Sequence, residues 1–428
     1  MLSNEDNAIL TSVGPGTLMG NLFRQYWLPV LMSSEIAEPD GPPKRVRILG
    51  EDLIAFRSTN GEVGLLANHC PHRGASLFFG RNEEGGLRCV YHGWKFDTDG
   101  RCVDMPNEPP ESTFKDKIRH LAYPCREQNG AVWTYMGPRS EAPPFPELEW
   151  TQLPEGHYVL GKMLRECNWA QAFEGDIDDV HVSFLHSRLS VPTGSQMARL
   201  MHTQRSPHLE VLETAGGAMY GVRREANEEE YNWRIKHFLF PSMTVVNGGI
   251  PGALFGQIWV PMDDEHTMQW RIYWTPAEPL PEPLRQGGAA MMIDFLPNTT
   301  DSLGQWRTKA NKRNDYLLDY EVQRTVAFCG IASVPVQDKA VQESMGAIQD
   351  RTTEHLGRTD AMITMVRRRL IGAAKALRDR GAAPPGVDQP DLYAVRSAVI
   401  NLPKAAHWVE QTRDVVRAFT DLPVAIIS

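Results

Sequence analysis

Two short loops, each with one cysteine and one histidine, constrain the fold of this chain more than any other feature of its sequence. Cys70–His72 reads Cys-Pro-His, and Cys89–His92, which follows after sixteen residues, reads Cys-Val-Tyr-His. A glycine comes soon after each histidine, at Gly74 and Gly93. Thiolates and imidazoles are typical metal ligands, and a bound metal restricts how the chain around it folds. The segment that carries the two loops is therefore predicted to fold around a metal centre.

Two kinds of centre use two cysteines and two histidines. Zinc sites usually draw their cysteines from one loop and their histidines from another, whereas each loop here supplies one of each. A Rieske [2Fe–2S] centre requires this division, because two cysteines bind one iron and two histidines bind the other. Its potential, roughly −150 to +300 mV, suits it to accept and pass on electrons. We expect Cys70, His72, Cys89 and His92 to hold such a cluster, with zinc as the alternative.

The composition excludes several classes of protein. The chain has 428 residues, a net charge of −9, and ordinary hydrophobic and charged contents of 42% and 23%. The acidic balance argues against a nucleic-acid binder. The N-terminus is acidic, unlike a signal peptide, and no apolar run approaches the length of a membrane-spanning helix. Six cysteines are too sparse for a disulfide scaffold. We expect a cytoplasmic protein that binds neither nucleic acid nor a membrane.

Turn and proline signals mark a small module near the start of the chain. Runs with strand periodicity at 45–49 and 53–57 are followed by Asn60-Gly61, a strong hairpin signal. Short strands with turn residues between them continue to about Tyr135. Four prolines in the segment 138–146 then indicate a boundary. The cysteine and histidine loops thus lie within a predicted all-β module.

The rest of the chain predicts a larger α+β domain. Strand patterns give way to helical periodicity after about residue 305. The predicted strands are 209–211, 233–240, 255–260 and 268–274. The predicted helices are 168–186, 305–320, 337–348 and 360–378. We expect an antiparallel sheet covered by helices. The chain is accordingly divided into three parts: an N-terminal helical segment at 1–25 that packs on the catalytic domain, the β module at 26–140 and the catalytic domain at 141–428.

A second group of possible metal ligands lies in the segment 178–186, where Asp178 precedes His181 and His186. Two histidines and a carboxylate can hold non-haem Fe(II), although paired histidines in a helix are more often structural or exposed. At 100° per residue the two histidines would lie about 140° apart around an ideal helix, too far to share one ion. We therefore expect a bend, a π-bulge or a helix end between them.

These motifs resemble those of a known enzyme family. Cys-Pro-His-Arg-Gly-Ala and Cys-x-Tyr-His-Gly-Trp-Lys-Phe-Asp resemble the Rieske domains of bacterial ring-hydroxylating oxygenases, in which Trp94 would pack beside the cluster loop. Asn-Trp-Ala-Gln followed by Asp-x-x-His-x-x-x-x-His resembles their catalytic iron site. Val-Gly-Pro-Gly-Thr-x-Met-Gly near the N-terminus and Asp-Arg-Thr-Thr-Glu-His-Leu-Gly-x-Thr-Asp near the C-terminus are similar to the phthalate dioxygenase branch. The resemblance therefore extends over the whole chain.

The resemblance implies roles for the second group of residues. His181 and His186 would bind the catalytic Fe(II), and Asp178 would link His181 to the Rieske ligand His92 of the partner subunit. The third iron ligand would be a distant carboxylate, and the acid-rich start of a late helix favours Asp338. The other candidates are Glu343, Asp350, Glu354 and Asp360, each of which is otherwise a solvent-facing helix charge.

The resemblance also implies the activity and its partners. The chain would be the terminal oxygenase that uses O2 and electrons from NADH, delivered by a separate flavin and iron–sulfur reductase, in aromatic catabolism. Its substrate would be an aromatic acid, oxidised by cis-dihydroxylation as a phthalate- or benzoate-like compound. The alternatives are an O-demethylating monooxygenase of methoxylated aromatic acids and a non-enzymatic Rieske electron-transfer or redox-sensing protein. The expected assembly is a homotrimer or a hexamer of stacked trimers.

A carboxylate substrate would favour an arginine in the middle sheet, since its guanidinium is always charged and can bind in a bidentate way. We select Arg234 and His208 as substrate-binding candidates from a wider basic set, which is otherwise surface charge. The branch carries an arginine where this chain has His208, which favours a monocarboxylate or phenolic aromatic over a phthalate dianion. The remaining members of the set are His202, Arg205, Arg223 and Lys236.

Overall fold

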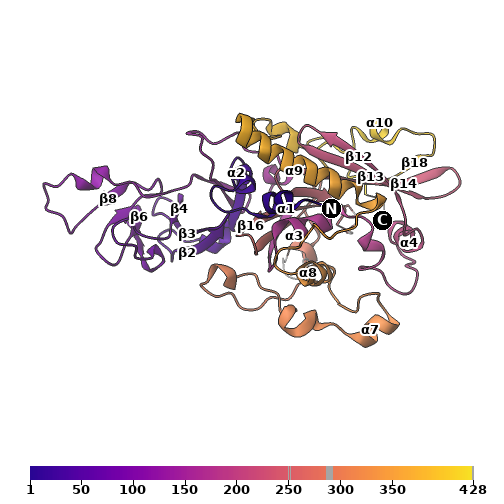
Figure 1. Cartoon of the computed structure of the whole chain (residues 1–428), viewed down its shortest axis with the longest axis horizontal. Helices are drawn as coiled ribbons and strands as arrows, with labels where there is room; N and C mark the ends of the chain where they lie inside the picture. Colours follow the sequence, from indigo (N-terminus) through magenta and orange to yellow (C-terminus); the bar gives the residue numbers. More distant parts are fainter. Residues whose placement is uncertain (249, 251, 286–292, 427–428) are drawn as a thin grey trace.

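The first third of the chain forms an all-β module at one end of an elongated molecule (Figure 1). The structure is a computed structural model that describes residues 1–248, 250, 252–285 and 293–426. The module contains three antiparallel sheets. One is β1 (Trp27–Met32), β10 (Ala131–Tyr135) and β9 (Cys125–Gln128); the next is β2 (Lys44–Ile48), β3 (Glu51–Arg57) and β4 (Val63–Ala67); the last is β5 (Arg81–Glu83), β6 (Gly86–Arg88), β7 (Lys95–Phe96) and β8 (Cys102–Asp104).

The strands of this module follow the sequence pattern closely. The predicted runs at 45–49 and 53–57 correspond to β2 and β3, and β3 pairs with β4 across the predicted hairpin. Gly61 in that hairpin has a φ of 88°, a conformation that glycine adopts without steric cost. Because β1 pairs with β10, the segment around Tyr135 returns to the start of the module and closes it.

A large antiparallel sheet forms the centre of the second part of the chain. Its strands lie in the order β11-β17-β16-β15-β14-β13-β12, and β18 also pairs with β14. Two strands pair with the same edge of β14: residues 237–239 of β14 pair with β15, and residues 230–235 pair with β18. The strands are β11 (Tyr158–Arg165), β12 (His208–Thr214), β13 (Gly217–Glu225), β14 (Glu230–Leu239), β15 (Met243–Val246), β16 (Leu254–Pro261), β17 (Thr267–Trp274) and β18 (Ala398–Pro403).

Helices from both ends of the chain pack together against this sheet. The longest, α9 (Ala361–Arg380), ends at Gly381 in the left-handed conformation and contacts α1 (Asn4–Thr11) and α2 (Leu18–Phe23). Figure 1 shows α9 passing over the end of the sheet that carries β12 and β13. Two further helices, α3 (Trp169–Ile177) and α8 (Val334–Ser344), lie side by side; the candidate ligands His181 and His186 follow the end of α3, and Asp338 lies within α8.

Short helices connect these elements, and one predicted helix is wrong. The short helices are α4 (Gln196–Thr203), α5 (Glu282–Arg285), α7 (Tyr320–Thr325) and α10 (Trp408–Thr412). The segment 305–320 was expected to be helical, but it forms turns, because Trp306, Asp315 and Tyr316 adopt positive φ angles that a right-handed helix does not allow. The α+β fold class is confirmed. No helix in the described ranges is long and apolar enough to cross a membrane.

Candidate functional site

The two cysteine and histidine loops have the same backbone structure. The amide of Cys70 donates to the carbonyl of Ala75, and the amide of Gly74 donates back to the carbonyl of Cys70. Cys89, Trp94 and Gly93 repeat both hydrogen bonds in the second loop. The two glycines have φ angles of 78° and 79°, which let each loop reverse sharply after its histidine. The sequence therefore forms two loops with the same backbone conformation, and these loops face each other.

The side chains of these loops are arranged as two pairs of like donors. Cys70 and Cys89 are buried, and burial together with the neighbouring Cys89 thiol raises the pKa of Cys70 to about 11. The rings of His72 and His92 meet edge to face with their centroids 4.5 Å apart. This division, thiols with thiols and imidazoles with imidazoles, fits the two irons of a [2Fe–2S] cluster, one bound by sulfur and the other by nitrogen.

A single zinc ion does not fit this geometry. Within the described ranges, only one set of three or more His, Cys, Asp or Glu residues has ligand atoms within 4.8 Å of one another, and it is His181, His186 and Asp338. Four donors around one zinc ion would lie about 2.0–2.3 Å from the metal and hence close to one another. The four donors of the β module, as they lie here, are therefore too far apart to bind one zinc ion together.

Trp94 supports the histidine side of this centre. Its ring stacks on His72 with centroids 4.4 Å apart and planes inclined by 8°. Its Nε1–H donates to Asn107 Oδ1 at 2.8 Å, which fixes the ring in this position. The packing expected from the sequence for Trp94 is confirmed.

The second group of residues lies where α3 ends. The backbone of Asp178 is extended (φ −89°, ψ 123°), and its carboxylate accepts hydrogen bonds from the amides of Val180 (2.8 Å) and His181 (3.4 Å). The chain then makes a short 3-10 turn over His181–Ser183. Since the α-helix stops before the first histidine, the two imidazoles are no longer fixed 140° apart. We expected a bend, a π-bulge or a helix end between the two histidines. The α-helix instead ends earlier, at Ile177, so the predicted helix over 168–186 is too long, and only the short 3-10 turn of His181–Ser183 ends between the histidines.

The two histidines and Asp338 converge on one point. His181 Nε2 lies 3.2 Å from His186 Nε2, and Asp338 Oδ1 lies 3.5 Å and 3.1 Å from these two atoms respectively. Asp338 comes from α8, and its pKa is held far below the ordinary range because the two imidazoles outweigh the effect of burial. Two neutral nitrogens and one carboxylate oxygen facing one point form the donor set that non-haem Fe(II) sites use, with the remaining positions left open.

The opposite nitrogen of each ring is held by a different side chain. His181 Nδ1 lies 3.4 Å from Asp178 Oδ2, and His186 Nδ1 lies 2.7 Å from Gln337 Oε1. Although burial lowers it, Asp178 and Asp338 raise the pKa of His181 to about 10, so a metal would have to displace a proton from this ring before Nε2 could bind it. Acceptors at Nδ1 favour the tautomer in which Nε2 carries a lone pair for a metal. The structure thus directs both Nε2 atoms toward Asp338.

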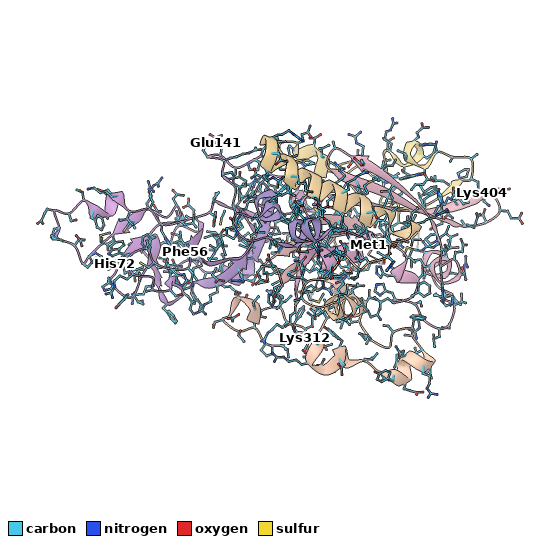
Figure 2. The ribbon with its side chains drawn as sticks, in the orientation of Figure 1. Met1, Phe56, His72, Glu141, Lys312 and Lys404 are labelled. Carbon is cyan, nitrogen blue, oxygen red and sulfur yellow. The ribbon has the colours of Figure 1, made fainter. Side chains whose placement is uncertain are left out.

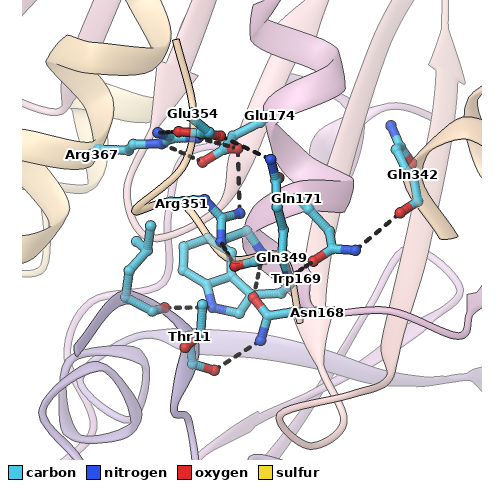
Figure 3. Close-up of polar contacts among 12 residues, drawn as sticks. Thr11, Asn168, Trp169, Gln171, Glu174, Gln342, Gln349, Arg351, Glu354 and Arg367 are labelled. Atoms are coloured by element: carbon cyan, nitrogen blue, oxygen red, sulfur yellow. Dashed lines mark hydrogen bonds and ion pairs between the residues drawn. The ribbon is translucent and has the colours of Figure 1, made fainter. Parts of the chain in front are cut away.

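A buried polar network fixes α3 relative to α8 and α9. Gln171 Nε2 donates to the carbonyls of Gln342 (3.0 Å) and Gly346 (2.8 Å) at the end of α8. Glu174 accepts hydrogen bonds from Arg367 of α9 at 2.7 Å and 2.8 Å. Figure 3 shows these contacts together with those of Arg351, which also reaches Glu174. Because α3 and α8 carry the two halves of the metal site, this network sets the distance between the halves.

The triad lies in a cavity of about 720 Å³. Strands β14, β16 and β17 supply one wall, with Lys236, Phe255 and Arg271 among the lining residues, and Met201 of α4 lies across from them. Asp176 also lines the cavity, and burial raises its pKa to about 6 despite hydrogen bonds from Thr244 and Trp259. A space of this size holds an aromatic ring with substituents.

The two substrate-binding candidates occupy different places. Arg234 is 4% exposed and lines the cavity, but its Nη1 already pairs with the buried Asp179 at 2.7 Å. His208 begins the edge strand β12, where its side chain is exposed and lies 3.5 Å from Glu210. It is not among the residues that line the cavity. The structure therefore brings Arg234, but not His208, to the triad.

The other acids considered for the third ligand are engaged elsewhere. Glu343 is buried against Lys339 and accepts a hydrogen bond from Tyr316, and Glu354 pairs with Arg367. Asp350 and Asp360 accept hydrogen bonds from backbone amides of their own turns. Of the five acids, Asp338 alone joins the two histidines.

Several residues of the site were missed by sequence reasoning. Gln337, Asp179, Asp176, Gln257 and Arg271 all contact the site or line its cavity. A signal existed for Arg271, because polar residues alternate with apolar ones along the predicted strand at 268–274, whereas the strand at 255–260, which carries Gln257, does not alternate. That alternation usually indicates a face exposed to solvent, whereas here the polar face lies under the cavity.

Two family models match the chain. The model described as Rieske [2Fe-2S] domain matches residues 26–121, and the model described as LigXa C-terminal domain like matches residues 134–421. The first contains both cysteine and histidine loops, and the second contains the triad, its cavity and the helices that support them.

Curated relatives resemble the chain over most of its length. The 3-chlorobenzoate-3,4-dioxygenase oxygenase subunit of Comamonas testosteroni is 43% identical over 420 residues, covering 95% of this chain and 97% of the relative. The phthalate 4,5-dioxygenase oxygenase subunit of Pseudomonas putida is 37% identical over 393 residues, with 88% and 87% covered. The 5,5'-dehydrodivanillate O-demethylase oxygenase subunit of Sphingobium is 33% identical over 396 residues, with 90% and 84% covered.

Solved structures share the fold at lower sequence identity. Dicamba monooxygenase bound to dicamba aligns with a TM-score of 0.60 and 18% identity, covering 84% of this chain and 100% of that chain. The oxygenase in an oxygenase and ferredoxin complex of carbazole 1,9a-dioxygenase aligns with a TM-score of 0.54 and 18% identity, covering 88% and 94%. These likenesses support the arrangement of a small β module beside a larger helix-covered sheet.

Proposed function

This chain belongs to the Rieske oxygenases, as their terminal oxygenase alpha subunit, and we propose that His181, His186 and Asp338 hold its catalytic iron while Cys70, His72, Cys89 and His92 hold its [2Fe–2S] cluster. It is an oxidoreductase that uses O2 and electrons which reach it from NADH through a separate reductase. We propose that its reaction is the dioxygenation of an aromatic acid. The convergence of two Nε2 atoms and one carboxylate oxygen at the floor of an aromatic-sized cavity carries this proposal.

The proposed chemistry divides between the iron centres and the protein. When bound, the cluster supplies electrons one at a time and the mononuclear iron activates O2 beside the substrate. Asp178 and Gln337 hold the two ligand rings by their Nδ1 atoms. The network around Gln171 and Glu174 keeps α3 and α8 at a fixed separation. The cavity walls place the ring of the substrate beside the triad and keep water away.

We propose that electrons reach His181 from the cluster of another copy of the chain, with Asp178 as the bridge between the two. Figure 1 shows the module that carries β6 and β8 at one end of the molecule, with α3 and α8 in the other part. Figure 2 likewise places His72 toward that end. A cluster at this end of the molecule is far from the triad of its own chain, so it would deliver electrons to the triad of a neighbouring subunit more readily. The bridge would run from His92 of the partner subunit through Asp178 to His181, which implies a homotrimer or a hexamer of stacked trimers.

The substrate class rests on the relatives and on the basic residues near the cavity. Relatives are named for 3-chlorobenzoate and phthalate, which are aromatic acids. We propose a benzoate- or phthalate-like acid for this chain, with Arg234 near its charged group, while the exposed position of His208 gives that residue no support. Because one relative is an O-demethylase, O-demethylation of a methoxylated aromatic acid is the second candidate reaction for this chain.

We also propose an electron donor for this chain. One structural neighbour is an oxygenase in complex with a ferredoxin, and we propose that the β module here docks a flavin and iron–sulfur reductase.

We propose the same domain division as from the sequence. The pairing of β1 with β10 supports a module that extends beyond residue 121, so the division stays at 26–140 and 141–428, with the helices of 1–25 packed on the latter. A cytoplasmic location stays a prediction.

The test combines product analysis with variants of the triad. The chain, loaded with both iron centres, would be supplied with NADH, a phthalate-type reductase and a panel of benzoates, phthalates and methoxybenzoates. We expect a hydroxylated or demethylated acid from wild type, and none from His181→Ala or Asp338→Ala. Both variants should keep the Rieske absorption. Product formation that survives either substitution would show that the catalytic metal lies elsewhere, and a protein that binds only zinc would contradict the proposal as a whole.

A further inference from the structure

The basic side chains near Arg234 are already neutralised in part. Arg224, Arg234 and Lys236 all contact one buried carboxylate, Asp179, at 3.2 Å, 2.7 Å and 2.6 Å. Each of the three is therefore held in an ion pair before any substrate arrives. A guanidinium already engaged with a carboxylate offers fewer free N–H groups to a second one.

Arg271 differs from these three cations in its ion pairing. It is 6% exposed and lines the same cavity as the triad, but no ion pair joins it to an acid in the described part of the chain. Its Nε has no hydrogen-bond acceptor among the residues that the structure describes, and its Nη1 makes a long contact of 3.4 Å with Gln257 Oε1. Its guanidinium lies 4.9 Å from the centre of the Phe255 ring, which limits the directions in which it can turn.

The surroundings of Arg271 do not supply the missing anion. The oxygens of Asp176, the nearby acid, already accept hydrogen bonds from Thr244, Gln257 and Trp259. A second buried arginine, Arg165, also lacks an ion pair among the described residues and has no acceptor at its Nη1. Buried charges are costly unless they are paired and hydrogen-bonded. An anion entering the cavity beside Arg271 would remove part of this cost.

The sheet places Arg271 far from the Asp179 group. Arg271 on β17 pairs with Gln257 on β16, and the next strands in order are β15 and then β14, which carries Lys236. Three steps of about 4.8 Å separate the outer two strands by about 14 Å. Part of the floor between them is apolar, with Val246 opposite Phe255, whose ring stacks on Tyr273 at 4.4 Å. Beside this apolar part lie Thr244 and Gln257, which donate hydrogen bonds to Asp176.

We infer that Arg271 receives the carboxylate of the aromatic acid and that the substrate ring lies over Val246 and Phe255, beside the triad. This inference rests on the proposed function and sharpens it, since it moves recognition of the acid from Arg234 to the opposite end of the cavity. The free Nε–H and the guanidinium edge can form the fork that a carboxylate accepts in a bidentate way. Phe255 and Tyr273 supply the aromatic surface on which the ring packs.

The experiment compares acids with their neutral amides in three variants of the iron-loaded protein. Benzoate, 3-chlorobenzoate and phthalate, and the amide of each, would be measured by equilibrium binding and by kcat/KM for product formation. Arg271→Met should weaken binding of the acids by at least about 30-fold and leave binding of the amides within a few-fold. Arg271→Lys keeps a charge and should lose less than Arg271→Met. Rieske absorption and bound iron confirm that each variant is folded.

Arg234→Met separates the two possible receptors. If it removes the preference for acids over amides while Arg271→Met does not, the inference is overturned. Equal losses for acids and amides in Arg271→Met would also overturn it, because they indicate a structural role. If Arg271→Met fails to hold iron, Arg271→Lys decides between the same two results. Wild type that oxidises the amides but none of the acids would contradict the proposed function itself, which keeps the two failures distinguishable.

Discussion

The Asp178 carboxylate lies 3.4 Å from Nδ1 of His181, on the side of the ring opposite the Nε2 that faces His186 and Asp338. This is an ion-pair distance rather than a hydrogen bond, and Nδ1 of His181 has no hydrogen-bond partner among the described residues. One imidazole thus connects an acid outside the triad to the triad itself. Asp178, which precedes the histidines and looks like a ligand in the sequence, lies outside the triad and contacts His181 instead.

Asp178→Asn should separate this linking role from metal binding. The amide keeps an acceptor for His181 Nδ1 but loses the negative charge, so both iron centres should still be bound. Electron passage to the catalytic iron should slow by about 10- to 100-fold, the usual cost of altering a residue that orients a metal ligand. Single-turnover product formation with the pre-reduced protein measures this rate. A normal single-turnover rate with full iron content would refute the link.

Gln337 should matter for iron affinity although it does not face the triad. Its Oε1 accepts from His186 Nδ1 at 2.7 Å, and its Nε2 donates to the carbonyl of Ile331 at 2.6 Å. Gln337→Ala removes the acceptor, and we expect Fe(II) to bind about 10- to 100-fold more weakly. Gln337→Glu keeps an acceptor at this position and serves as the matched control. Competition with a chelator, followed while the Rieske absorption stays constant, measures the change, and equal affinities in the two variants would exclude this role.

The motifs could be located from the sequence because their chemistry depends on close spacing. Each Rieske loop supplies its donors within four residues, and the glycine that shapes each loop is adjacent. Asp338 lies some 150 residues from the histidines, so periodicity alone could not select it, and its assignment came from the resemblance. The cavity wall was missed for another reason. Polar residues on alternate positions of β17 predict a solvated face, and only the packing of α3 over the sheet turns that face inward.

Local signals failed where the backbone departs from regular structure. The segment 305–320 contains good helix formers, but left-handed residues at Trp306, Asp315 and Tyr316 break it into turns. In this arrangement the Tyr316 hydroxyl donates to Glu343 of α8, a contact between residues 27 apart in sequence. Such tertiary contacts outweigh helix propensities, which amount to less than about 1 kcal/mol per residue.

The Glu174 network should contribute strongly to stability. Glu174 is buried between Arg367 and Arg351, and both arginines would lose a partner in Glu174→Gln. Breaking a buried ion pair typically costs about 3–5 kcal/mol, because the remaining charge stays buried. Urea unfolding should show a loss of this size. Glu321→Gln, which removes the exposed partner of Arg324, is the control and should change stability far less.

His237 should make stability depend on pH in the mildly acidic range. It lies fully buried on β14, with its Nε2–H donating to the carbonyl of Arg396 at 3.1 Å. Burial lowers the pKa of His237 from the ordinary 6.5 to about 4. Between these two values the unfolded chain binds a proton that the folded chain does not. The free energy of unfolding should therefore fall as the pH drops from about 6.5 toward 4, and be insensitive to this group above 6.5.

The size of this effect follows from the shift. Lowering the pH from 7.5 to 5 should cost about 2 kcal/mol through His237, since each pKa unit corresponds to about 1.4 kcal/mol. Urea unfolding at the two pH values measures it in wild type and in His237→Gln, whose amide can still donate to the Arg396 carbonyl but does not titrate. The variant should lose less stability over this range by that amount, whereas His407→Gln at an exposed position should keep the wild-type dependence. Identical pH dependence in wild type and His237→Gln would show that other groups, and not this buried imidazole, set the acid limit of the fold.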